Sequence, residues 1–343
     1  MKAVMIHAAH DLRIEDVPVG TPGPGQVRVR IGAGGICGSD LHYYHHGGFG
    51  VIRLKEPMVL GHEVAGTVEA LGEGVSHIAV GARVAVSPSL PCGMCRFCQQ
   101  GLQQHCLDMR FYGSAMRFPH VHGAFRETVI CEAVQVHEVT GAVSLGEAAM
   151  AEPLAVCLHA ARRAGPLLGA RVLVTGSGPI GVLAAIAARR AGAAEIVVTD
   201  VADKPLGYAL AVGADMALNT AANPEALEPY KAAKGQFDVC LEASGNGHAL
   251  RSALDVVRPG GVIVTLGLGG EVSLPLNTIV AKEIELRGTF RFHEEFALAV
   301  RLISQKLVDA KPLISHTMAV DDAVAAFDLA GDRSQAMKVQ LSF

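Results

Sequence analysis

The sequence predicts an α/β protein with two domains, one rich in β-strands and one built on a doubly wound parallel sheet. A chain of 343 residues is long enough for two hydrophobic cores. Short strand-like runs separated by glycine and proline fill residues 1–148. From residue 171 onward, apolar strands alternate with helical stretches, which is typical of a parallel sheet covered by helices.

The first domain is expected to consist of short strands joined by tight turns. Glycines and prolines at 21–25 form a turn between two of the early runs, and later runs end at glycines. The predicted strands are 2–6, 12–17, 26–31, 63–71 and 82–86.

A histidine and a glutamate stand side by side where an apolar run ends, and they suggest a metal site. Gly61 frees the backbone just before His62 and Glu63. On its own this pattern also describes a strand with one inward and one outward polar residue, and a lone cysteine is usually a small buried hydrophobe. Cys37 upstream and Glu152 downstream favour the metal site, because both can contribute a further ligand. Together the four side chains form a plausible catalytic zinc site with an open position.

Residues after the cysteine extend this hypothesis. Asp40 is placed to orient the metal-binding histidine through its second ring nitrogen. Ser39 could carry a proton from a substrate hydroxyl toward solvent, and a simple turn residue explains it equally well. We interpret the three following histidines as a solvated loop rather than a metal tract; they are His42, His45 and His46.

Four cysteines within fifteen residues predict a second metal site. Cys92, Cys95, Cys98 and Cys106 have the spacing C-x2-C-x2-C-x7-C. Four thiolates can close a tetrahedral structural zinc site. The bacterial iron–sulfur run has a shorter last spacing and a following proline, whereas Leu107 follows here. Disulfides are disfavoured because the clustered cysteines indicate a reducing compartment.

A dinucleotide-binding pattern opens the second domain. A buried strand at 171–175 leads into G-x-G-x-x-G at 176–181, and a helix follows at 182–191. The next strand, 195–200, ends in an acid. This order of strand, glycine turn, helix and acid is far more specific than the glycines alone.

Each glycine of this pattern, and the acid that follows it, has a physical role. Gly176 permits the tight turn, Gly178 the approach of a pyrophosphate, and Gly181 close packing of the helix. Asp200 would accept hydrogen bonds from the ribose hydroxyls and repel a 2′-phosphate, which favours NAD over NADP. Lys204 nearby weakens that preference.

The alternation continues to complete a sheet of six parallel strands. Ligands bind beyond the carboxyl ends of such strands, so residues 266–268 and 289–291 should border the nicotinamide. The predicted elements are strands 237–242, 261–266 and 285–289 and helices 247–257 and 277–282.

The last segment is expected to return to the first domain. The helix at 294–306 and the strand at 338–341 do not fit the parallel sheet. We therefore predict a cofactor domain at 149–291, inserted into a catalytic domain formed by 1–148 and 292–343, with the zinc lobe at about 88–108.

Composition limits the partners. The net charge of −4 and the lack of a long basic run argue against nucleic acid. No apolar run reaches the ~18 residues of a membrane span. The start lacks the features of a signal peptide. These observations predict a soluble, cytoplasmic protein.

The motifs, in this order, resemble those of the zinc-dependent medium-chain dehydrogenases, the superfamily of alcohol and sorbitol dehydrogenases. The resemblance spans the chain, from Cys37 and 61–63 through 92–106 and Glu152 to 176–181. It implies a GroES-like catalytic domain, a Rossmann domain, NAD and two zinc ions per chain, one catalytic and one structural. It also implies a homo-oligomer, a tetramer or a dimer.

The resemblance also implies roles for particular residues. The catalytic set would be Cys37, Ser39, Tyr43, His62, Glu63, Glu152 and Arg291. Of these, Cys37, His62, Glu63 and Glu152 would serve the catalytic zinc, with either glutamate bound directly or through water. The cofactor contacts would be Gly176, Gly178, Pro179, Ile180, Gly181, Asp200, Leu266, Gly267, Leu268, Thr289, Phe290 and Arg291. Sorbitol dehydrogenases carry an arginine five residues beyond the ribose-binding acid, where this chain has Pro205.

Within the polyol branch, the sequence is similar to enzymes that oxidise a secondary alcohol of a sugar acid. Segments 37–44, 108–116, 118–121, 288–292 and 336–341 carry this likeness. A sugar acid needs a cation for its carboxylate, and the candidates are Arg110, Arg117 and Arg291. Sorbitol, xylitol and L-threonine dehydrogenases are the alternatives in the same class. A non-catalytic protein that binds zinc and nucleotide is the alternative from another class.

Overall fold

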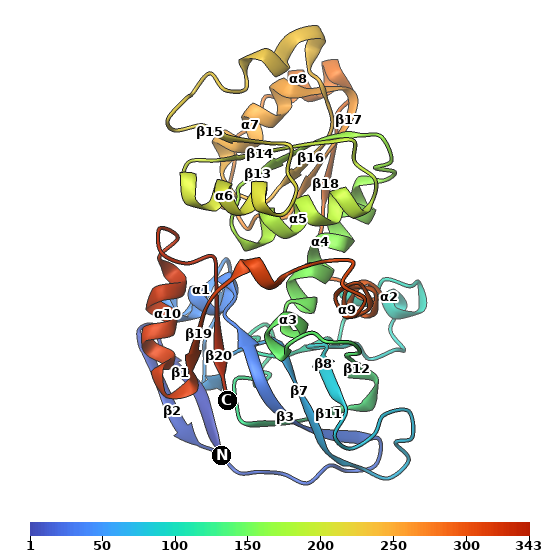
Figure 1. Ribbon diagram of the computed structural model, residues 1–343, viewed down its shortest axis with the longest axis vertical. Helices are drawn as coiled ribbons and strands as arrows, with labels where there is room; N and C mark the ends of the chain where they lie inside the picture. Colours follow the sequence, from blue (N-terminus) through green and yellow to red (C-terminus); the bar gives the residue numbers. More distant parts are fainter. The chain divides into compact units, whose positions relative to one another are not determined.

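The computed structural model describes residues 1–343, which divide into two compact units (Figure 1). One unit comprises Met1–Glu152 and Phe296–Phe343, and the other is Pro153–Glu295. The chain passes between the units twice, slightly beyond the predicted residues 148 and 291.

A mixed sheet forms the centre of the first unit. Its strand order is β12-β8-β7-β3-β20-β19, with β11 also paired to β3. The C-terminal strand β20 therefore lies directly beside β3, and β3 lies beside β7. The strands of the sheet are β3 (Gln26–Gly35), β7 (Glu63–Leu71), β8 (Arg83–Val86), β11 (Thr128–Glu132), β12 (Val136–Glu138), β19 (Ile314–Ala319) and β20 (Lys338–Ser342).

Smaller elements surround this sheet. A three-stranded sheet has the order β2-β1-β6, and two short strands, β9 and β10, pair beside the four-cysteine segment. These elements are β1 (Lys2–Ala8), β2 (Asp11–Asp16), β6 (Met58–Val59), β9 (Ser89–Leu90), β10 (Arg110–Phe111), α1 (Gly38–His46), α2 (Arg96–Gln99), α3 (Leu145–Ala149), α9 (Glu295–Ser304) and α10 (Ala323–Gly331).

Residues 38–46 form the helix α1, which corrects the interpretation of the histidine segment as a loop. Tyr43 and Tyr44 are buried on the inner side of the helix, so packing stabilises a segment without strong helix formers. Gly47 ends the helix in a left-handed conformation with φ of 65°, and its N–H bonds the carbonyl of Tyr43.

The second unit contains six parallel strands, the number expected, in the order β15-β14-β13-β16-β17-β18. Five of them match strands located from the sequence, and β15 is the one that the sequence did not locate. Helices α5 and α6 cover one face of the sheet, and α7 and α8 cover the other (Figure 1). The elements are β13 (Arg171–Thr175), β14 (Glu195–Asp200), β15 (Met216–Asn219), β16 (Phe237–Glu242), β17 (Val257–Thr265), β18 (Glu285–Gly288), α4 (Ala151–Ala164), α5 (Pro179–Arg190), α6 (Asp203–Ala211), α7 (Gly247–Val256) and α8 (Leu276–Lys282).

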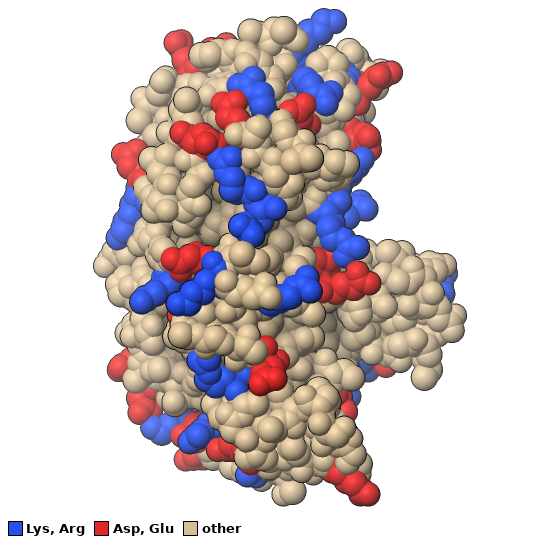
Figure 2. Space-filling view, turned by 45° about the vertical axis from the view of Figure 1, so that its right-hand side comes forward, with Lys and Arg blue, Asp and Glu red and all other residues tan.

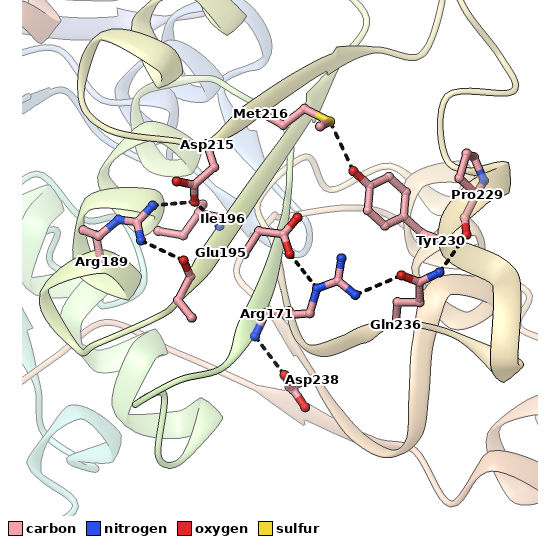
Figure 3. A network of polar contacts seen from close by, with 11 residues as sticks. Arg171, Arg189, Glu195, Ile196, Asp215, Met216, Pro229, Tyr230, Gln236 and Asp238 are labelled. Carbon is pink, nitrogen blue, oxygen red and sulfur yellow. Dashed lines mark hydrogen bonds and ion pairs between the residues drawn. The ribbon is translucent and has the colours of Figure 1, made fainter.

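A polar network ties together the amino ends of these strands (Figure 3). Arg171 binds the carboxylate of Glu195 with its Nε at 2.6 Å, and its N–H donates to Asp238 at 2.8 Å. Arg189 pairs with Asp215 on the same part of the sheet. The network lies at the end of the strands opposite the glycine turn, which leaves the carboxyl ends for a ligand.

Charged side chains of both signs lie on the surface of the molecule. Positive and negative side chains are interspersed over the face shown in Figure 2. None of the helices combines the length and the apolar character that a membrane span requires.

Candidate active site

Cys37, His62 and Glu63 bring their ligand atoms within 4.8 Å of one another. The cysteine caps the amino end of α1, and the glutamate begins β7. Gly61 has a φ of 91°, and a Cβ there would lie 2.1 Å from the ring of Phe125. Only glycine therefore allows the chain to turn the histidine and the glutamate toward the cysteine.

Asp40 joins the two segments that carry these ligands. One of its carboxylate oxygens accepts the N–H of Cys37 at 3.0 Å, and the other accepts the N–H of Gly61 at 3.2 Å. The same carboxylate lies 3.6 Å from Nδ1 of His62, beyond hydrogen-bond length, so this buried nitrogen has no hydrogen-bond partner. Burial raises the pKa of Asp40, and the nearby His62 opposes that rise.

Lys338 completes the cluster and was not identified as a functional residue from the sequence. Its Nζ lies 2.8 and 2.7 Å from the two carboxylate oxygens of Glu63 and 3.1 Å from the carbonyl of Ile36. Across the ladder, Gly35 leaves room for the glutamate, since a Cβ there would lie 2.1 Å from a carboxylate oxygen. Burial lowers the pKa of Lys338, but the charge of Glu63 outweighs it and the pKa is raised.

Glu152 lies near the cluster, at the amino end of α4, but outside the 4.8 Å group. It is buried, and burial raises its pKa to about 8; His62 opposes this, while Glu63 and Cys37 add to it. A carboxyl with this pKa can hold or release a proton near neutral pH, which suits a proton carrier.

Two other predicted residues lie on α1. Ser39 is half-buried in its first turn. Tyr43 is 1% exposed, and its hydroxyl accepts the N–H of Ala115 at 2.9 Å. That bond fastens α1 to the 108–116 segment. The ring of Phe111 in the same segment packs 5.6 Å from the ring of His62.

The four cysteines of the second predicted site form one compact group. The ligand atoms of Cys92, Cys95, Cys98 and Cys106 lie within 4.8 Å of one another, and the Sγ atom of Cys95 is 3.6 Å from that of Cys98 and 3.9 Å from that of Cys106. A tetrahedron with zinc–sulfur bonds of ~2.3 Å has edges of about 3.8 Å. Main-chain N–H groups of Cys92 and Asp108 donate to the sulfur of Cys106. Main-chain hydrogen bonds from Leu107 and Cys98 lower the pKa of Cys95 to about 6. These thiols fit a structural zinc ion.

The cysteine, histidine and glutamate of the first cluster also fit zinc. They are the donors that zinc prefers, and the partnerless Nδ1 of His62 is the kind of buried atom that a metal satisfies. Three protein donors leave a fourth position open for an oxygen ligand.

The glycine turn of the second unit is built as the fingerprint requires. Gly176 has a φ of 86°, and a Cβ on Gly181 would lie 1.8 Å from the carbonyl oxygen of Gly176. The carboxylate of Asp200 accepts the N–H of Ser177 at 2.6 Å. It also accepts the N–H groups of Val201 and Ala202, the two residues after Asp200. The hydroxyl of Ser177 donates to the carbonyl of Pro205, so the proline lies directly beside the turn.

The helix α5 begins at this turn. Gly178 is its N-cap, Pro179 is its first residue and Ile180 its second. The free N–H groups of this end favour an anion such as a pyrophosphate.

The other predicted cofactor residues follow β17 and β18. Residues 266–268 leave β17, and Leu268 is exposed. The hydroxyl of Thr289 is buried without a partner. Arg291 has a positive φ of 54°, and its guanidinium lies 4.9 Å from the ring centre of Phe290. Such backbone strain in a non-glycine residue is often found where a side chain serves a ligand.

The polar side chains of the 108–120 segment differ in whether they are already paired within the protein. Arg117 pairs with Asp108 at 2.7 Å, and His120 uses both ring nitrogens on main-chain groups, one of them the N–H of Lys55. Arg110 is exposed, with no acidic partner. It is therefore the cation of this segment that remains available to an anionic ligand.

Comparison with known proteins places these features in a family. The alcohol dehydrogenase GroES-like domain matches residues 23–141, and the zinc-binding dehydrogenase domain matches residues 179–305. The chain is 44% identical to Escherichia coli K-12 L-idonate 5-dehydrogenase (NAD(P)(+)), over 92% of this chain and 91% of the relative. It is 36% identical to chicken (Gallus gallus) sorbitol dehydrogenase, over 99% and 95%.

The solved structures agree. The crystal structure of Escherichia coli K-12 L-idonate 5-dehydrogenase matches with a TM-score of 0.96 and 41% identity, covering 100% of this chain and 98% of the other. The two matched domains, the relatives along the whole chain and the two clusters of metal-binding side chains agree with one another. The chain belongs to the zinc-binding dehydrogenase family, in its alcohol and polyol dehydrogenase group.

Proposed function

We propose that this protein is a zinc-dependent, NAD(P)-linked dehydrogenase that interconverts L-idonate and 5-keto-D-gluconate. The cluster of half-buried Cys37 with buried His62 and Glu63 carries the proposal for the chemistry. Similarity over nearly the whole chain to L-idonate 5-dehydrogenase supports the substrate. Asp200 at the end of β14 supports NAD as the preferred cofactor.

The chain's own residues would position the reaction. A zinc ion held by the cluster would supply Lewis-acid polarisation of the substrate hydroxyl. Glu152 in its deprotonated form would accept the hydroxyl proton, and Ser39 in the first turn of α1 would pass it toward solvent. The glycine turn and α5 would hold the pyrophosphate of a dinucleotide that accepts hydride.

The substrate carboxylate needs a guanidinium that is not already paired. Arg117 is engaged by Asp108, whereas Arg110 is exposed and has no acidic partner, which favours Arg110 for this role. A guanidinium grips a carboxylate with two parallel hydrogen bonds, and a neutral polyol offers no such group. A sugar acid would therefore bind more tightly than sorbitol.

A polyol dehydrogenase is the second candidate. The sorbitol dehydrogenases align along almost the whole chain at 35–36% identity, which favours sorbitol or xylitol as the alternative substrate. Under either assignment we place the enzyme in the cytoplasm as a homo-oligomer, a tetramer or a dimer. Sedimentation velocity of the purified chain tests that assembly.

Initial rates with NAD and NADP test the function. The panel is L-idonate, sorbitol, xylitol, D-gluconate and L-threonine, with the absorbance of the reduced cofactor as the signal. L-idonate with NAD should have the highest kcat/KM. A higher kcat/KM for sorbitol or xylitol would reject the sugar acid as the substrate and support the polyol dehydrogenase assignment. No turnover with any of these substrates would favour a non-catalytic binding protein.

A further inference from the structure

Four histidines form a patch near the last turn of α1, and none of them belongs to either cysteine-containing cluster. The rings of His42 and His46 are 6.1 Å apart between centroids, and those of His45 and His46 are 6.0 Å apart. The ring of His10 lies 5.5 Å from that of His45. The patch therefore joins a helix to the turn between β1 and β2.

His42 and His46 have the spacing that lets two side chains meet on a helix. Residues four apart lie one above the other on the same face, and two histidines at this spacing are a recurrent zinc-binding arrangement. His46 is exposed and His42 half-buried, and neither ring nitrogen pair is engaged in a hydrogen bond within the chain. The rings can therefore rotate until one nitrogen of each lies ~2.1 Å from a shared ion.

The backbone around the patch is held in place. His10 has a positive φ of 61°, and its N–H donates to the carbonyl of Tyr44 at 2.7 Å. That bond fixes the β1–β2 turn against α1. A positive φ in a residue other than glycine costs energy and is often kept where it serves a ligand.

The surroundings favour the neutral form of the imidazole, which is the form that binds metal. Burial lowers the pKa of His42, and the neighbouring His46 and His45 lower it further. The donors are imidazoles, which suit zinc, nickel and copper rather than magnesium or calcium.

We propose that α1 carries a third, exchangeable transition-metal site in which His42 and His46 bind one divalent ion such as Ni²⁺, Zn²⁺ or Cu²⁺. The site is separate from the two zinc sites, and it goes beyond the dehydrogenase activity. Cys37 is the N-cap of α1, and the patch lies at the other end of the helix. An ion bound here would therefore stabilise the last turn of the helix that positions the thiolate of Cys37.

Calorimetric titration of the zinc-loaded enzyme with Ni²⁺ tests the proposal, together with elemental analysis of zinc and nickel in the same samples. Wild type should take up one Ni²⁺ per chain without losing zinc. His42→Gln and His46→Gln should each weaken that binding at least tenfold and leave the zinc content and the turnover unchanged. His248→Gln, on an exposed histidine of α7 without a histidine neighbour four residues away, is the matched control and should bind like wild type.

Three results would overturn the assignment. The first is a wild type that binds no Ni²⁺ beyond its zinc sites, and the second is binding by both variants as tight as that of the control. Loss of binding in His45→Gln but in neither His42→Gln nor His46→Gln would place the ion on the His10 and His45 pair instead.

Discussion

Lys338 and Glu63 form a buried ion pair in which the Nζ atom lies 2.7 and 2.8 Å from the two carboxylate oxygens. The lysine is 3% exposed and the glutamate 1%. The pair brings the last strand of the chain to the residue that follows His62, so it makes the C-terminal segment part of the proposed metal centre.

Replacing the lysine should destabilise the fold strongly. Lys338→Met leaves the carboxylate of Glu63 buried without its cation, and breaking such a pair costs ~3–5 kcal/mol. The double variant Lys338→Met, Glu63→Leu should recover much of that loss because neither charge remains buried. Denaturant unfolding of the two single variants and the double variant measures the coupling. Lys2→Met, in an exposed pair with Asp321, is the control and should change stability little. Additive effects in the double variant would show that the pair is not coupled.

The four-cysteine lobe should serve stability rather than turnover. Cys95→Ser removes one corner of the thiolate tetrahedron, so the lobe should lose its zinc ion and the melting temperature should fall. Cys131→Ser is a matched control, because that buried thiol lies outside both clusters and bonds only a carbonyl. Iron and sulfide in the wild-type protein would contradict the assignment of zinc to the lobe.

Asp200 should govern the choice between NAD and NADP. Its carboxylate would repel a 2′-phosphate, so Asp200→Ala should narrow the preference for NAD, by about tenfold for each 1.4 kcal/mol of lost discrimination. The same change removes the acceptor of the Ser177 N–H, so affinity for NAD should also fall. The ratio of kcat/KM for the two cofactors is the readout. Equal use of both cofactors by wild type would refute the role of Asp200 and direct attention to Lys204.

The stability of the protein should depend on pH through Glu295. Burial raises the pKa of this carboxyl, but hydrogen bonds from His159 and from the N–H of His293 outweigh it and lower the pKa to about 2. A depressed pKa stabilises the fold above the ordinary value of 4.5, and the contribution is lost as pH falls from there through 2. Wild type should therefore have a higher unfolding free energy than Glu295→Gln at pH 6. This difference should shrink by up to ~3 kcal/mol when the pH falls to 2. A difference that does not change with pH would contradict this.

Local patterns were sufficient to predict the elements that depend on neighbours in sequence. The strands at 63–71, 171–175, 195–200 and 237–242 have the predicted bounds because apolar runs end there at glycine or at charged residues. The four-cysteine group could be predicted for the same reason, because its four ligands lie within one short segment of the sequence.

Features that depend on distant segments could not be predicted in this way. Lys338 looks like one polar residue in a strand, and its role emerges only because β20 pairs with β3 beside Glu63. The helix α1 contains poor helix formers and depends on buried tyrosines and on the Asp40 carboxylate. The short strand β15 has no buried residue and therefore no clear apolar pattern.

Zinc content and L-idonate turnover, measured on the same samples of wild type and Cys37→Ser, test the central claim most directly. The two clusters predict about two zinc ions per wild-type chain and turnover with NAD. Cys37→Ser should keep about one zinc ion, in the four-cysteine lobe, and should lose turnover while it remains folded. Full turnover in Cys37→Ser, or a wild-type enzyme that is active with only the lobe occupied, would contradict a catalytic zinc centre at Cys37, His62 and Glu63.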